Sequence, residues 1–200
     1  MSKDPRAEAL QKFVDGVVKQ ARTNLTRRQK NASKKLYNSI KGDSKVYPNS
    51  IRIGFAMEDY GFFQDQGVKG ANPSKVSKNA KIRGQQAPNS RFKFGSGNYA
   101  GTWQSFVSNI EVWAKRKGIR LRDEQGKYKK GNYRTIAQII AGNIYNRGIK
   151  PTMFFSDALE TKLKKLPTEL INPYVLTVSN IIDIAIKENV RKNAVYNAGK

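Results

Sequence analysis

The feature that most constrains the fold is a long apolar stripe near the start of the chain. Between residues 5 and 41, apolar side chains recur mostly three or four positions apart, so they share one face of a helix. Pro5 suits the first helical turn with Asp4 as its cap, and Gly42 suits the end. We therefore expect one long helix, or two in line. The stripe comprises Leu10, Phe13, Val14, Val17, Val18, Ala21, Leu25, Ala32, Leu36 and Ile40.

A hairpin candidate follows this helix. The stretches SKVY (44–47) and SIRIGFAM (50–57) flank Pro48-Asn49, which is a turn signal. Ile51, Ile53 and Phe55 alternate with polar or small residues, which is the period of a half-buried strand. The sequence therefore predicts an α+β fold, in which a small antiparallel sheet is packed by amphipathic helices.

The rest of the chain predicts further helices and one long loop. A short aromatic helix or turn is expected in YGFFQDQGVKG (60–70), with Tyr60, Phe62 and Phe63 as core or interface anchors. Thr102 caps a helix that carries Trp103 and Phe106 on its apolar face, where we expect them in the core. An isoleucine-rich helix over 134–147 ends at Gly148, and another helix follows Pro151. We expect one domain over residues 1–166 and an added C-terminal helix, beginning at Asn172-Pro173, in an extension over 167–200.

The high net positive charge of the chain restricts the kinds of partner that it can have. Lys and Arg total 38 against 15 Asp and Glu, which gives a net charge of +23. Self-repulsion at this charge is tolerable when a polyanion such as nucleic acid, or an acidic protein, neutralises it. The bases gather in an extended basic loop within 68–101 and in a second cluster at the end of the Trp103 helix. The loop set is Lys69, Lys75, Lys78, Lys81, Arg83, Arg91 and Lys93, and the second set is Lys115, Arg116, Lys117, Arg120 and Arg122.

Three interpretations of the basic loop stay open. Glycine, proline, serine and asparagine dominate it, and loops of this length are usually functional or disordered. It is a solvated loop, an arm that orders on a neighbouring subunit, or a contact to phosphates. If the loop is such an arm, deleting residues 70–92 should leave the fold intact and weaken assembly. The interpretation of the second cluster is equally open, because cations are favoured at any helix C-terminus.

Several kinds of catalytic chemistry find no support in the residues. The chain has neither Cys nor His, which excludes thiolate chemistry, Ser-His triads and most zinc sites. No phosphate-cradling glycine motif is present, and no apolar run approaches the roughly 20 residues that span a bilayer. The carboxylates Glu58, Asp59 and Asp65, and the pair Asp123-Glu124, are interpreted as surface charges rather than a metal site. We expect no cofactor, no metal, no catalytic residue and no membrane contact.

Two segments carry a family resemblance. The first holds Tyr60, Phe63, Asp65 and Gly67, and the second, GIKPTMFFSDALE (148–160), holds Pro151, Phe154, Phe155, Ala158 and Leu159. With the order of the elements around them, they resemble the tail-completion or neck proteins of tailed bacteriophages over roughly residues 5–165. The chain also looks like ring or connector proteins of crAss-like podophages that infect gut Bacteroidetes.

The resemblance implies a structural virion protein made in the host cytoplasm. Such a protein forms a ring of 12 or 6 copies in the head–tail connector. The ring joins the portal or an adaptor to tail proteins. It surrounds the packaged DNA and contacts it without sequence specificity. The alternatives are a stand-alone basic nucleic-acid-binding protein and, third, a metal-dependent nuclease.

Overall fold

The computed structural model describes residues 5–30, 33–47, 50–76, 78, 80–96, 102–123, 125–128 and 132–166. The chain divides into two compact units where one domain over 1–166 was expected. Unit 1 comprises Met1–Asp65 and Thr152–Lys200, and unit 2 comprises Gln66–Pro151. Unit 2 is therefore inserted between two parts of unit 1. The Pro48-Asn49 turn and the helix expected to begin at Asn172-Pro173 lie outside the described residues.

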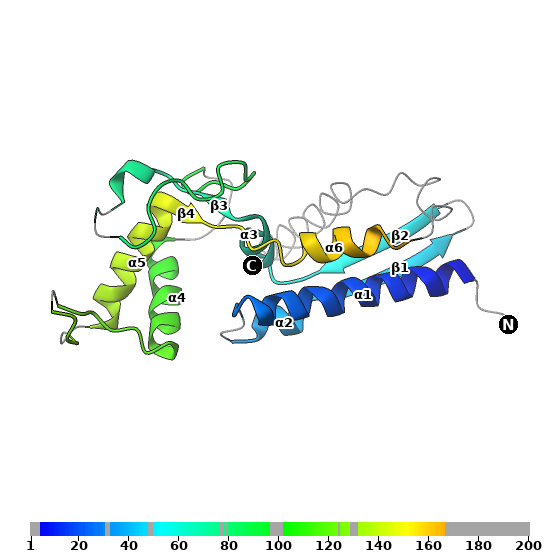
Figure 1. Cartoon of the computed structure of the whole chain (residues 1–200), viewed down its shortest axis with the longest axis horizontal. Helices are drawn as coiled ribbons and strands as arrows, with labels where there is room; N and C mark the ends of the chain where they lie inside the picture. The colour runs from blue at the N-terminus through cyan, green and yellow to red at the C-terminus, as the bar shows by residue number, and fades with distance from the viewer. Residues whose placement is uncertain are drawn as a thin grey trace, which may run out of the picture. The chain divides into compact units, whose positions relative to one another are not determined.

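Unit 1 is built on a long helix that lies along a β-hairpin (Figure 1). The hairpin consists of β1 (Lys41–Tyr47) and β2 (Ser50–Ala56), which are antiparallel with Lys41 opposite Ala56 and Tyr47 opposite Ser50. The remaining elements are α1 (Pro5–Arg27), α2 (Lys35–Ser39), α3 (Tyr60–Gln66) and α6 (Ser156–Leu163). The prediction of an α+β fold with a small antiparallel sheet and a long N-terminal helix is confirmed.

The long helix ends earlier than the apolar stripe predicts. Gln29 and Lys34 both adopt a positive φ of 54°, which a continuous helix does not contain. The stripe therefore continues on a separate short helix, α2, and Lys41 already belongs to β1. Local breaks of this kind leave the apolar spacing intact, so the sequence pattern alone does not reveal them.

The apolar face of α1 is buried against the hairpin. The half-buried residues of β1 and their partners Ile51, Ile53 and Phe55 lie on one face of the hairpin. A Cβ added to Gly42 would come within 2.5 Å of Val14 Cγ1. The ring of Phe55 meets the ring of Phe155 edge-on at 5.2 Å between centroids. Packing of this density stabilises unit 1 chiefly through burial of apolar surface. The residues with no exposed surface include Leu10, Val14, Val17, Ala21, Leu25, Ile40 and Phe155.

Unit 2 combines a helical hairpin with a short ribbon. The helices α4 (Trp103–Arg116) and α5 (Tyr133–Arg147) pack around Val107, Ala137 and Ala141. The expected cap is confirmed, because Thr102 and Ser105 exchange backbone and side-chain hydrogen bonds in a capping box. The strands β3 (Val68–Lys69) and β4 (Gly148–Ile149) form the ribbon, and a 3₁₀ turn, η1 (Pro73–Lys75), follows β3.

Two glycines allow the ribbon to approach the end of α5. A Cβ at Gly70 would lie 2.0 Å from the carbonyl oxygen of Asn146, and a Cβ at Gly148 would lie 2.2 Å from that of Val68. Gly148 also has a φ of +94°, which favours glycine. The prediction that Gly148 closes the helix is confirmed, and the ribbon requires glycine at both positions.

Candidate functional site

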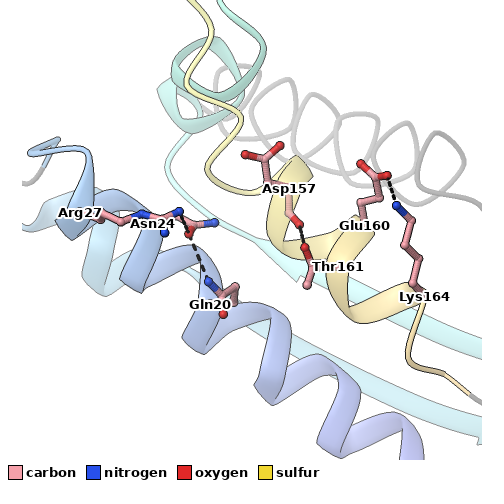
Figure 2. A pocket seen from close by; sticks show the side chains of 7 residues that line it. All are labelled: Gln20, Asn24, Arg27, Asp157, Glu160, Thr161 and Lys164. Carbon is pink, nitrogen blue, oxygen red and sulfur yellow. Dashed lines mark hydrogen bonds and ion pairs between the residues drawn. The ribbon is translucent and has the colours of Figure 1, made fainter.

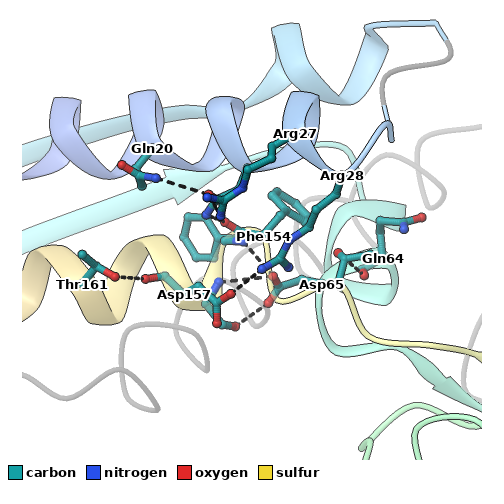
Figure 3. Close-up of polar contacts among 12 residues, drawn as sticks. Gln20, Arg27, Arg28, Gln64, Asp65, Phe154, Asp157 and Thr161 are labelled. Carbon is teal, nitrogen blue, oxygen red and sulfur yellow. Dashed lines mark hydrogen bonds and ion pairs between the residues drawn. The ribbon is translucent and has the colours of Figure 1, made fainter.

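The two segments that carry the family resemblance meet at a buried carboxylate. Asp65, near the end of α3, has no exposed surface. Its Oδ1 accepts hydrogen bonds from the backbone N–H groups of Phe155 at 2.7 Å and Ser156 at 3.2 Å. Its Oδ2 accepts a short hydrogen bond from the Ser156 hydroxyl. We call this arrangement the Asp65 junction (Figure 3).

The Asp65 junction supplies a cap that the local sequence cannot. Phe155 precedes the first residue of α6, and its side chain has no group that could accept a hydrogen bond from the helix N-terminus. Asp65, from ninety residues earlier in the chain, accepts hydrogen bonds from the N–H groups of Phe155 and Ser156 instead. A carboxylate at this end of a helix is also favoured by the helix dipole.

Backbone hydrogen bonds strengthen the Asp65 junction. The N–H of Met153 donates to the carbonyl of Asp65 at 2.9 Å, and the Thr152 hydroxyl donates to the carbonyl of Gln64 at 2.7 Å. Met153 adopts a φ of +51° to make this turn. The end of α3 and the segment before α6 are therefore fixed to each other by both backbone and side-chain groups.

Burial raises the pKa of Asp65 above its ordinary value. The hydrogen bonds from Ser156 and Phe155 act in the opposite direction, and the nearby charge of Asp157 adds a further small increase. All the carboxylate contacts are internal, so this group holds the fold together rather than facing a substrate.

A polar cavity of about 350 Å³ lies between α1 and α6 (Figure 2). Its wall includes the buried Asn24, whose amide donates to the Phe154 carbonyl at 2.9 Å and whose Oδ1 accepts from Gln20 and Arg27. Beside it, Arg28 pairs with Asp157 at 2.6 Å (Figure 3). The cavity is lined by Gln20, Asn24, Arg27, Asp157, Glu160, Thr161 and Lys164.

No sequence pattern indicates several of the residues that hold this region together. Asn24 lies on α1 among polar residues, and Ser156 follows two phenylalanines, so neither forms a recognisable motif. Ser156 offers one weak signal, because Ser is common at helix starts. The partners of both residues come from distant parts of the chain, and local patterns do not indicate them.

The residues at the family-motif positions differ in how deeply they are buried. Phe154, Phe155, Ala158 and Leu159 are fully buried, as the motif predicts for a helix that docks on the hairpin. Gly67 has a φ of +73°, and a Cβ there would lie 2.5 Å from the carbonyl oxygen of Ile149. Phe63 and Pro151 are half-buried.

Two aromatic residues that were expected in the core or at an interface have exposed rings. Tyr60 is 42% exposed, whereas its neighbour Phe62 is buried. Trp103, predicted to be a core residue, is 48% exposed, and its ring borders Phe106 and Tyr145 at about 6 Å. The buried cluster between α4 and α5 is small and consists of Val107, Ala137 and Ala141. A large indole therefore remains at the edge.

The basic loop folds against its own unit. The N–H of Lys69 donates to the carbonyl of Phe92, and the N–H of Phe94 donates to the carbonyl of Lys69. Phe92 is buried, and the Ser90 hydroxyl donates to the carbonyl of Gly67 at 2.8 Å. These contacts contradict the expectation that residues 70–92 can be removed without damage to the fold. Lys69 is half-buried, while Lys75, Lys78, Lys81, Arg83, Arg91 and Lys93 are exposed.

The second basic cluster lies at the end of α4 and just beyond it. Lys115 pairs with Glu111 at 2.9 Å. The side chains of Arg116, Lys117, Arg120 and Arg122 are exposed, and none of them forms an ion pair within the described part of the chain. Arg120 and Arg122 contact the ring of Tyr128.

The acidic candidates do not converge. Glu58 pairs with Lys35 at 3.0 Å, and Asp59 is exposed. The interpretation of Asp65 as a surface charge is wrong, because Asp65 is fully buried and faces the start of α6. Asp123 accepts a hydrogen bond from the backbone of Lys127. Over the described ranges, no group of three or more acidic side chains could hold a metal ion together. No helix there is both long and apolar enough to cross a bilayer.

Comparison with known proteins adds no relative: no family model, no curated protein and no solved structure matches the chain.

Proposed function

We propose that the chain is a structural virion protein that forms a homo-oligomeric ring in the head–tail connector of a tailed phage. In this role it joins portal or adaptor proteins to tail proteins around the DNA. The observation that carries the proposal is the Asp65 junction. It ties together the two segments, 60–67 and 151–159, on which the resemblance to neck proteins rests.

The junction has the properties expected of an architectural element. Its carboxylate is completely buried and its hydrogen bonds are all internal, so it fixes a helix onto the hairpin rather than binding a substrate. A ring subunit needs such rigidity, because small errors in shape accumulate around a closed assembly. The positive charge of the chain suits a position beside a polyanion.

The purified full-length protein tests this proposal directly. Mass photometry and negative-stain electron microscopy, with and without the portal and tail proteins of the same virus, should show discrete closed rings. A monomer that forms no ring alone or with these proteins would overturn the proposal. Cleavage of DNA that requires magnesium and disappears in Glu58→Ala or Asp65→Ala would also overturn it, provided that both variants remain folded.

The second candidate function is a stand-alone nucleic-acid-binding protein. It is favoured by the many exposed bases of unit 2, where 18 Lys and Arg less 3 Asp and Glu leave a charge of +15. This function predicts salt-sensitive binding of nucleic acid by a monomer or dimer, with no larger assembly. The same mass measurements therefore separate the two candidates.

A further inference from the structure

The second basic cluster continues into a small hairpin with an exposed aromatic ring. We define the basic hairpin as residues 119–128, of which 124 is not described. An antiparallel β-bridge joins Arg122 to Tyr128 within it. The N–H of Asp123 donates to the carbonyl of Lys127 at 2.9 Å, and Gly126 makes the turn with a φ of +79°. The segment is therefore a built hairpin rather than a passive run of charged residues.

The side chain of Arg122 is held in one position on this hairpin. Its Nη1 donates to the carbonyl of Gly126 at 3.0 Å, and its Nη2 donates to the Tyr128 hydroxyl at 3.1 Å. Its guanidinium carbon lies 4.5 Å from the centre of the Tyr128 ring. A guanidinium has five N–H donors, so several remain for a ligand. Because the side chain is already ordered, binding through it costs less conformational entropy.

The cations beside the hairpin are not needed to end α4. The last carbonyls of the helix, at Trp113, Ala114 and Lys115, already accept backbone N–H groups from Lys117, Ile119 and Gly118. Gly118 stops the helix with a φ of +62°. Arg116 and Lys117 therefore lie beside the hairpin with their charges available to a partner.

We propose that the basic hairpin and the end of α4 bind the phosphate backbone of DNA, with Arg122 and Arg120 as phosphate ligands and Tyr128 as a stacking surface. This deepens the connector proposal, on which it rests for the identity of the DNA. Residues 114–134 hold nine bases and two acids. One of those acids, Asp123, is engaged by the backbone of Lys127 at 2.8 Å.

The chemistry favours phosphates over an acidic protein surface. Protein–protein interfaces are depleted of lysine, whereas Lys115, Lys117 and Lys127 are exposed here beside the arginines. Planar guanidinium groups match the geometry of phosphate oxygens. Tyr128 is 62% exposed, which leaves its ring accessible to a base of single-stranded DNA.

The test is binding of a short fluorescein-labelled DNA of mixed sequence, single-stranded or duplex, to the full-length protein over a series of salt concentrations. For the double variant R120Q/R122Q we expect about tenfold weaker binding and a salt slope reduced by about 2. The matched control is K81Q/R83Q, which removes the same charge from exposed positions of the basic loop. It should keep most of the affinity and the slope. Y128L should weaken single-strand binding more than Y128F does, because Y128F keeps the ring.

Three outcomes would overturn this inference. The first is wild-type affinity in R120Q/R122Q, and the second is an equal loss in R120Q/R122Q and K81Q/R83Q. The third is displacement of the DNA by polyglutamate as readily as by polyphosphate, since this would indicate a surface with no preference for phosphate. Both tryptophans of the chain lie in unit 2, so unchanged tryptophan fluorescence verifies that the variants are folded.

The outcomes also separate this inference from the connector proposal. Wild-type protein that assembles into rings and does not bind DNA overturns the inference and leaves the connector proposal standing. A monomer that binds DNA through the basic hairpin and never assembles overturns the connector proposal and leaves the inference of DNA binding standing.

Discussion

Unit 1 and unit 2 bury different kinds of groups. In unit 1, large side chains such as Leu25 and Phe155 fill the space between α1, the hairpin and α6. In unit 2, the buried cluster between the helices is Val107, Ala137 and Ala141, and the ribbon depends on glycines that allow backbone atoms to approach. Unit 1 is therefore stabilised mainly by apolar burial, while unit 2 depends more on close backbone fit and on hydrogen bonds from its loop.

The two units also differ in charge. Of the total of +23, unit 2 carries +15, because it holds 18 Lys and Arg but only 3 Asp and Glu. Both tryptophans lie in unit 2, and more than a third of each side chain is exposed. Unit 2 therefore carries most of the net positive charge and both partly exposed tryptophans, whereas unit 1 packs large side chains between α1, the hairpin and α6. Each of the following predictions tests one side of this contrast.

The largest expected effect comes from the core of unit 1. Phe155→Ala should lower the free energy of unfolding by about 3–5 kcal/mol, because it leaves a cavity against Phe55. Far-UV circular dichroism during denaturation measures this loss. The matched change in unit 2, Val107→Ala, removes fewer buried atoms and should cost less, which tryptophan fluorescence would follow. An equal or larger loss in Val107→Ala would contradict the contrast between the two cores.

The next effect comes from the Asp65 junction. Asp65→Ala should destabilise unit 1 by about 3 kcal/mol, since it leaves the N–H groups of Phe155 and Ser156 and the Ser156 hydroxyl without their acceptor. Asp157→Asn is the control, because it weakens only the partly exposed pair with Arg28 and should cost less than about 1 kcal/mol. Similar midpoints in urea for the two variants would show that the junction is not a main support of the fold.

The sequence predicts those parts of the fold that depend on neighbouring residues, and it does not predict contacts between distant segments. The strand alternation of Ile51, Ile53 and Phe55, and the Thr102 cap, depend on neighbouring residues, and both predictions are confirmed. The positions of Phe154 and Phe155 in the core were expected from the family motif. The acceptor role of Asp65 was not, because its donors lie about ninety residues away and form no local pattern.

The basic loop shows why its structure could not be predicted. Its composition is typical of a flexible arm, and this is all that local propensity reports. What holds the loop is a set of distant partners: Gln86 donates its N–H to the carbonyl of Arg147, and Gly70 donates its N–H to the side chain of Gln85. The arrangement depends on the closeness of β3 and β4, and the sequence does not reveal the pairing of two-residue strands.

A matched pair of glycine substitutions tests the backbone fit of unit 2. Gly70→Ala would place a Cβ 2.0 Å from a carbonyl oxygen, so we expect a loss of about 1–3 kcal/mol as the ribbon shifts. Gly142→Ala lies within α5 with open space around it and should stabilise unit 2 by about 0.5–1 kcal/mol. Tryptophan fluorescence in denaturant measures both. Two changes of the same sign would mean that close approach at Gly70 does not limit the stability of unit 2.

The smallest expected effect is the pH dependence of unit 1. Burial raises the pKa of Asp65 above its ordinary value, so in the intervening pH range the folded state binds a proton that the unfolded state releases. The contribution of Asp65 to stability is therefore fully present below the ordinary pKa and is lost as the pH rises through the folded pKa. Asp65→Asn cannot bind this proton, so the stability advantage of the wild type over the variant should grow as the pH is lowered through the range. Paired urea denaturations followed by circular dichroism measure the difference. A wild-type advantage that shrinks on acidification would mean that the hydrogen bonds from Phe155 and Ser156 favour the charged carboxylate more than burial disfavours it.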